Sequence, residues 1–191
     1  MDARQLRLLL GWLLCALPAL LSAHEGRLTH SLDDLARRYT TPTAVGAFLQ
    51  QEFTFRRDEE LFGQIEYWQS PLEFLQRRSG DCEDYALLAR DLLLRNGMEA
   101  YVFSLFGTRG YAHTVCLFVD ADGRYNVINQ ATVVFYRAQS LEALAAQLYP
   151  EWTFGGIVEQ EGTRGRLVRE IRYVAPTASF ISLDTVASVP F

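Results

Sequence analysis

The chain has 191 residues, which is enough for one compact domain with a sizeable core and short for two domains. Hydrophobic residues make up 49% and charged residues 21%, so an intrinsically disordered chain is excluded. The net charge is −5, and the basic residues are all arginines, scattered without forming a basic stripe. We therefore expect no nucleic-acid partner.

The N-terminus has the pattern of a secretory signal peptide. Arg4 and Arg7 precede an apolar run at positions 8–21, and the small residues Ser22 and Ala23 follow it. The run is about 14 residues long, whereas a membrane-spanning helix needs roughly 20. We predict export of the chain, and an uncleaved amphipathic anchor is the alternative. The predicted units are a signal peptide (1–23), a single domain (24–176) and a C-terminal tail (177–191).

Short helices are expected next along the chain. A helix is predicted over residues 31–39, and a second begins after Thr41 with a proline at its first position. The mixed stretch 56–68 is interpreted as a loop. Ser70 and the following proline open another short helix, and Gly80 is expected to end it.

The best helical pattern follows immediately, in the stretch that begins GDCED. Asp81 is a suitable N-cap, and Glu83 and Asp84 lie in the first turn, where carboxylates stabilise a helix. Asn96 and Gly97 supply the C-terminal stop. The leucines and alanines between these ends form a broad apolar face, so we expect this helix to be central.

After Gly97 the pattern changes to strands. Gly-rich connections and the turn at 120–123 separate apolar and β-branched segments that indicate an antiparallel meander. The predicted fold class is α+β, with the central helix packed on this sheet. The expected strands are 98–106, 111–119, 124–130 and 133–137, then a helix at 140–148 and a hairpin of 152–160 with 165–175.

Three polar residues are candidates for thiol chemistry. Cys82 lies at a helix N-terminus, where the dipole stabilises a thiolate, and His113 lies in the second strand of the meander. The expected pairing places Asn129 opposite residue 114, next to His113. A cysteine nucleophile, a histidine base and an orienting amide together can cleave or transfer an acyl group.

A disulfide is the competing interpretation of Cys82. After removal of the signal peptide only Cys82 and Cys116 remain, and two cysteines in an oxidising compartment normally pair. Side chains alternate along a strand, so His113 and Cys116 lie on opposite faces. We therefore expect a Cys82 placed against His113 to lie on the face away from Cys116, which makes the two interpretations mutually exclusive.

The motifs WQSPLEF (68–74) and GDCEDYA (80–86), with a weaker continuation through His113, resemble the transglutaminase-like cysteine proteases. The resemblance covers a core motif region at about residues 60–135 and is greatest to the bacterial periplasmic branch that releases adhesins. It implies a papain-like or transglutaminase-like core in which Cys82 is the nucleophile and His113 the general base. The family usually has aspartate as the third residue, whereas this chain has Asn129, which carries no charge to stabilise the ion pair.

The resemblance also implies a calcium site. Acidic residues flank the cysteine in the adhesin-releasing branch, and the matching positions here are Asp81, Glu83 and Asp84. A Ca²⁺ ion would relieve the repulsion among three neighbouring carboxylates. Helix capping by the same side chains is the alternative, and both interpretations remain open.

We expect an exported cysteine peptidase that acts on a protein or peptide substrate in the cell envelope, in the periplasm or secreted. The resemblance further suggests an inhibitory protein partner. The backbone N–H of Cys82 is the first expected oxyanion donor, with Trp68 and Gln64 as candidates for the second. An amidase or protein acyltransferase of the transglutaminase type is one alternative function, and a non-catalytic transglutaminase-like binding module is the other.

Overall fold

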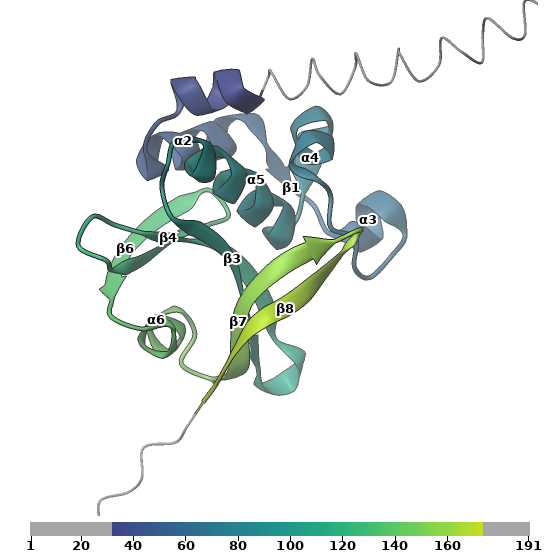
Figure 1. The fold of residues 1–191 in the computed structure, drawn as a ribbon. Coiled ribbons are helices and arrows are strands. Elements are labelled where there is room, and N and C mark those ends of the chain that lie inside the picture. Colours follow the sequence, from purple (N-terminus) through teal and green to yellow (C-terminus); the bar gives the residue numbers. More distant parts are fainter. Residues whose placement is uncertain (1–31, 174–191) are drawn as a thin grey trace, which may run out of the picture.

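A computed structural model describes residues 32–173 of the chain and shows a six-stranded antiparallel sheet with helices on both faces (Figure 1). The strand order is β6-β5-β4-β3-β7-β8, so the predicted meander is present and the C-terminal hairpin joins it next to β3. The predicted α+β class is confirmed. The sheet strands are β3 (Ala100–Gly107), β4 (Ala112–Val119), β5 (Tyr125–Asn129), β6 (Thr132–Ala138), β7 (Trp152–Glu161) and β8 (Arg164–Arg172).

The helices follow the predicted order, with one addition. A helix over residues 32–38 comes first, and Thr41 caps the next helix by accepting from the backbone N–H of Ala44. Ser70 and Glu73 form a reciprocal capping box at the start of a later one. The helices are α2 (Pro42–Glu52), α3 (Asp58–Phe62), α4 (Pro71–Arg77), α5 (Cys82–Arg95) and α6 (Leu141–Leu148).

Two local predictions are wrong. The stretch 56–68 is not all loop, because α3 forms there, with three acidic residues in its first turn and Gly63 in a left-handed conformation at its end. Gly80 does not end α4, since Arg78 takes the left-handed C-cap position. Gly80 instead belongs to a short strand, β2 (Ser79–Gly80), which pairs in parallel with β1 (Thr54–Phe55).

The sheet separates two apolar cores. The larger core lies between the sheet and the N-terminal helices, with α5 at its centre, and it includes Cys116 and Phe118 from β4. The smaller core lies on the other face under α6 and includes Val115 and Leu117 of the same strand. The central position predicted for α5 is therefore confirmed: its inward leucines are fully buried against the sheet.

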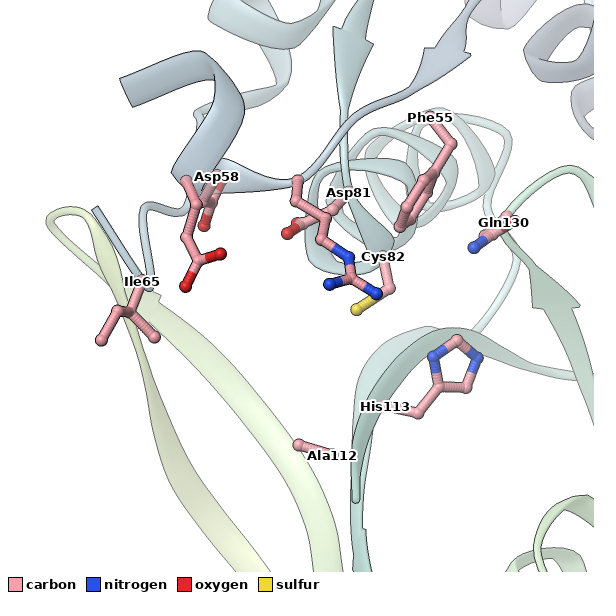
Figure 2. Close-up of a pocket in the computed structure, with 10 residues that line it drawn as sticks. Phe55, Asp58, Ile65, Asp81, Cys82, Ala112, His113 and Gln130 are labelled. Atoms are coloured by element: carbon pink, nitrogen blue, oxygen red, sulfur yellow. The ribbon is translucent and has the colours of Figure 1, made fainter. Parts of the chain in front are cut away.

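The prediction that Cys82 lies on the face of the sheet away from Cys116 is wrong. Because Cys116 packs in the core that contains α5, Cys82 and Cys116 belong to the same side of the sheet. Both cysteines are nevertheless free, with Cys116 fully buried in the core and Cys82 at the start of α5. Cys82 lies in the same pocket as His113 because His113 is near the start of β4, where the α5 N-terminus reaches the strand (Figure 2).

The predicted signal peptide and C-terminal tail lie outside the described residues. No helix within residues 32–173 has the length and apolar character needed to cross a membrane.

Candidate functional site

Cys82 occupies the first helical position of α5, with Asp81 as the N-cap residue. The carboxylate of Asp84 accepts from the Asp81 backbone N–H at 3.2 Å, which fixes this first turn. The Cys82 thiol donates to Glu83 Oε2 at 3.1 Å, and the sulfur accepts from the backbone N–H of Thr114 on β4. Cys82 is thereby attached to the strand that carries His113.

The electrostatic surroundings of Cys82 favour its neutral form. Burial raises the pKa of the thiol, and the adjacent Glu83 charge raises it further, while the N–H of Thr114 opposes this effect. Burial and the neighbouring Asp81 also raise the pKa of Glu83. A protonated Glu83 removes the charge that opposes thiolate formation.

His113 and Asn129 are in direct contact. His113 Nε2 lies 2.8 Å from Asn129 Oδ1, and because an amide oxygen only accepts, Nε2 is the protonated nitrogen and Nδ1 is left free. The register differs by one residue from the expected one, since Cys116 pairs with Ile128. Continuing that register places Asn129 opposite Val115, on the same face as His113, whereas the expected pairing would have turned its side chain away.

A pocket of about 330 Å³ joins these groups (Figure 2). Cys82 lies near its centre, with His113 and Gln130 to one side and Asp58 and Ile65 to the other. Ile65 is 85% exposed at this rim, and Phe55 and Ala112 are the other apolar residues of a largely polar lining. The lining residues are Phe55, Arg57, Asp58, Glu59, Ile65, Asp81, Cys82, Ala112, His113 and Gln130.

Three carboxylates form a cluster beside the cysteine. Ligand oxygens of Asp58, Asp81 and Asp84 all lie within 4.8 Å of one another. The pairing of β1 with β2 produces this cluster, because it brings the start of α3 alongside the start of α5. One oxygen each of Asp58 and Asp81 is buried without a hydrogen-bond partner among the described residues. Such orphaned oxygens are suited to a hard cation.

Burial makes these carboxyls hard to ionise. It raises the pKa of Asp58 to about 6 and that of Asp84 to about 7, in both cases aided by the charge of Asp81. Backbone N–H groups of Tyr67 and Gln69 oppose the shifts by donating to Asp58 and Asp84 respectively. The cluster consists of carboxyl groups only, so a bound cation would supply the positive charge that offsets them.

Gln69 and Gly80 pack against the Asp84 side chain of the cluster. The Gln69 side chain donates to Asp84 Oδ2 at 2.6 Å and to the Ser79 carbonyl at 3.0 Å, and Arg77 Nε donates to Gln69 at 3.1 Å. A Cβ on Gly80 would lie 2.0 Å from Asp84 Oδ2 and 2.6 Å from Gln69 Nε2. The glycine of the GDCED stretch is therefore required by close packing rather than by a helix end.

The structure distributes the other predicted site residues differently. Asp81 and Asp84 share a cluster with Asp58, and Asp81 is also close to Cys82 and Glu83, whose carboxylate contacts the thiol. Asp58 was not foreseen; its only sequence signal is the acidic start of α3. Trp68 is 4% exposed, donates from its indole N–H to Glu66 and does not line the pocket. Gln64 is exposed and does not line the pocket either.

Comparison with known proteins adds a family assignment. A family model described as a transglutaminase-like domain matches residues 29–148, which is more than half of the chain. That range contains all three candidate catalytic residues, the carboxylate cluster and most of the sheet.

Individual matches are shorter or more distant. The centrosomal protein of 76 kDa from Xenopus laevis is 46% identical over 61 residues, which is 32% of this chain and 9% of that protein. The human protein of the same name is 41% identical over 61 residues, so the chain spans only about a tenth of these relatives. The calcium-bound LapG structure from Legionella pneumophila is 21% identical, with a TM-score of 0.45, covering 72% of this chain and 78% of LapG.

Proposed function

Because the chain belongs to the transglutaminase-like domain family, we propose that it is a cysteine peptidase that cleaves a protein substrate through an acyl-enzyme on Cys82. One observation carries the proposal: the imidazole of His113 is held by Asn129 at 2.8 Å in the same pocket as Cys82. A nucleophile, a base and an orienting group that meet in one pocket form the minimal machinery for acyl transfer.

The side chains have distinct roles in this reaction. His113 takes the thiol proton at its free Nδ1, and the Cys82 sulfur attacks the carbonyl carbon of the scissile bond. The tetrahedral oxyanion forms near the N-terminus of α5, where the Cys82 backbone N–H is available as a donor. His113 then gives its proton to the leaving amine, and later accepts one from the water that hydrolyses the thioester. Asn129 keeps the ring oriented throughout.

We further propose that Asp58, Asp81 and Asp84 bind Ca²⁺. The fit rests on the two orphaned buried oxygens and on the all-oxygen donor set, both typical of hard cations. When bound, the ion supplies positive charge at the start of α5. With the Asp81 charge offset, less negative potential acts on Cys82 and its thiolate is easier to form.

A non-catalytic binding module is the second candidate function. The observation that favours it is the burial of the Cys82 thiol together with its contact with Glu83, since both raise the pKa of the thiol and favour its protonated form. Under this alternative the pocket binds a peptide without cleaving it, and the thiol stays unreactive with or without a cation.

Alkylation of the thiol separates the two functions. We expect iodoacetamide at neutral pH to modify Cys82 in the folded protein, faster with Ca²⁺ than with chelator, as measured by mass spectrometry of the Cys82 peptide. Cys82→Ala provides the blank, and His113→Ala should slow the reaction because the imidazole no longer takes the proton. An inert Cys82 in folded, calcium-loaded protein would support the binding module instead.

The cellular setting is proposed from the sequence pattern at the N-terminus. We propose an exported protein that acts in the bacterial periplasm, or secreted, on a protein of the cell envelope, and that an inhibitory protein partner controls it. Comparing the envelope proteins of cells that carry the natural chain with those of Cys82→Ala cells identifies the substrate. Full-length proteins that accumulate only in the Cys82→Ala cells are the expected candidates.

A further inference from the structure

We infer that Gln130 is a substrate-binding residue whose side-chain amide holds the peptide main chain on the leaving-group side of the scissile bond. The inference rests on the proposed peptidase function and extends it to how the substrate is bound. It is carried by the strained backbone of Gln130, by the packing of its turn and by its place in the pocket.

The backbone of Gln130 is in a conformation that its side chain disfavours. Gln130 and Ala131 form the two-residue turn between β5 and β6, and Gln130 has φ of 52°. This first turn position normally carries glycine or asparagine, because other residues are strained at positive φ. The other two non-glycine residues with positive φ in the described chain have local reasons: Arg78 caps α4, and the N–H of Arg137 binds Asn126.

The turn is held rigidly against the helical half of the molecule. Gly46 of α2 packs so closely on it that an added Cβ would lie 2.8 Å from the Ala131 carbonyl and 2.7 Å from the Val133 side chain. Ala131 and Val133 also pack against the larger core. α2 and the core therefore restrain the backbone of the turn that carries Gln130, which is the condition under which strain persists at functional sites.

The Gln130 side chain lines the pocket with Cys82 and His113 (Figure 2). No hydrogen bond within residues 32–173 engages its amide, so one donor and one acceptor group remain available beside the catalytic residues. A primary amide matches the alternating C=O and N–H groups of an extended peptide, which would otherwise lose their hydrogen bonds to water on entering the pocket.

The position of Gln130 next to His113 decides which part of the peptide the Gln130 amide contacts. His113 protonates the leaving amine, so the residues beyond the scissile bond must lie on the histidine side of Cys82. Figure 2 shows Gln130 on that side, across the pocket from Asp58 and Ile65. The amide therefore contacts the departing part of the peptide and has no contact with the acyl part that remains on the sulfur.

Two substrates with the same acyl part test this assignment. An internally quenched peptide, chosen as the best substrate from a decapeptide library, has main chain on both sides of the cleaved bond. Its aminomethylcoumarin derivative has only an aromatic amine as leaving group. We expect Gln130→Gly to lower kcat/KM about tenfold for the peptide, mainly through KM, and less than twofold for the coumarin, as loss of one such hydrogen bond implies.

Matched variants separate binding from folding. Gln130→Gly relieves the positive φ and should keep the thermal midpoint of the natural chain. Gln130→Asn keeps a shorter amide at a tolerated φ and should retain part of the selectivity. Arg137→Gly, which makes the same change at a φ of 53° outside the pocket, should leave both substrates unaffected.

The failures of the two proposals are distinguishable. Equal effects of Gln130→Gly on both substrates, or no effect on the peptide, would overturn the role of Gln130 while the natural chain remains an active peptidase. If the natural chain cleaves no peptide in the library and its Cys82 does not react with iodoacetamide, the peptidase function itself is wrong and the role of Gln130 with it.

Discussion

At the scale of single residues, the acidic side chains around Cys82 have separate roles although they are adjacent in sequence. Asp84 is fully buried and accepts from Gln69 and from the start of its own helix. Asp81 has one orphaned buried oxygen and lies close both to Asp58 with Asp84 and to Cys82 with Glu83, and Glu83 contacts the thiol. The sequence alone presents these three carboxylates as one group, whereas the structure places Asp84 and Glu83 in two different groups that share Asp81.

The role of Glu83 predicts the effect of Glu83→Gln. The amide keeps a polar contact with the sulfur and carries no charge at any pH. Burial raises the pKa of Glu83 to about 10, so the natural side chain is already neutral at pH 7. We therefore expect iodoacetamide to label Cys82 at similar rates, within about twofold, in Glu83→Gln and in the natural chain at pH 7. Glu73→Gln, on the exposed start of α4, is the control that changes the same group away from the thiol. Severalfold faster labelling of Glu83→Gln at pH 7 would show that Glu83 is ionised there and that its charge raises the pKa of Cys82.

The carboxylate cluster predicts how stability depends on pH. The folded-state pKa of Asp58 is raised to about 6 and that of Asp84 to about 7, from an ordinary value of 3.8. The folded chain therefore binds more protons than the unfolded chain in this range, so the stability from these groups is full below pH 3.8 and is lost as the pH rises through 6 and 7. We expect the thermal midpoint in chelator to fall by several degrees between pH 5 and 8.

Calcium should reverse this loss, because a cation binds the deprotonated carboxylates of the folded chain. The calcium-induced rise in thermal midpoint is expected to be large at pH 8 and small at pH 5. Asp58→Asn should reduce both the pH dependence and the response to calcium. A midpoint that stays constant or rises toward pH 8 in chelator would contradict the raised pKa values.

At the scale of elements, the start of α5 depends on contacts that lie outside the helix. The β1–β2 pair holds Gly80 against Asp84 and Gln69, and it places α3 so that Asp58 reaches the cluster. The capping signals of the sequence explain why a helix begins at Cys82. They do not explain why a glycine precedes it, since that requirement comes from the packing of Gln69.

Gly80→Ala tests this dependence. The added Cβ would lie 2.0 Å from Asp84 Oδ2, so Asp84 and Gln69 must move and lose their hydrogen bonds. We expect a loss of about 1–3 kcal/mol in the free energy of unfolding, measured by urea denaturation, together with weaker calcium binding. Ser79→Ala, one residue earlier, leaves the backbone carbonyl that binds Gln69 intact and should change stability by less than about 0.5 kcal/mol. Equal stability of the two variants would argue against a packed cluster.

At the scale of the whole molecule, the site forms where the helical half packs on the sheet. Cys82 comes from α5, His113 and Asn129 come from β4 and β5, and the two sets meet only when the larger core is assembled. Trp68 fixes the β7–β8 hairpin to this assembly, since Gly165 packs on its indole and the Gln160 side chain donates to its carbonyl at 2.9 Å. The tryptophan predicted as an oxyanion donor lies in this hairpin contact instead.

The same packing predicts the state of the two cysteines. Cys116 is fully buried beneath α5 and its pKa is raised by burial, so its thiol is protected as long as the core is intact. We expect mass spectrometry to find Cys82 alkylated in the native protein and Cys116 alkylated only after unfolding, without reductant. Peptides that contain a Cys82–Cys116 disulfide in the natively purified protein would contradict the structure and the catalytic proposal together.

Local chemistry explains which parts of the structure were predictable. Caps, turn residues and alternating apolar residues predict α2, α4, α5 and the six strands, because these signals act within a few residues. The five-residue helix α3 was missed since its sequence lacks an apolar face. The strand register was wrong by one residue, and the turn alone does not fix register where both faces of a strand are apolar.

The sequence by itself determined that this is an α+β chain with a cysteine at the start of its central helix, and it singled out His113 and Asn129 as the side chains to meet that cysteine. Only the tertiary structure decided which carboxylates cluster, with Asp58 beside Asp81 and Asp84, and that Glu83 contacts the thiol. It also decided that Gln130 lines the pocket and that Trp68 does not. The physical reason is that capping and periodicity are local properties of the chain. Which side chains face one another across the pocket depends on strand register and core packing, and these join residues far apart in the sequence.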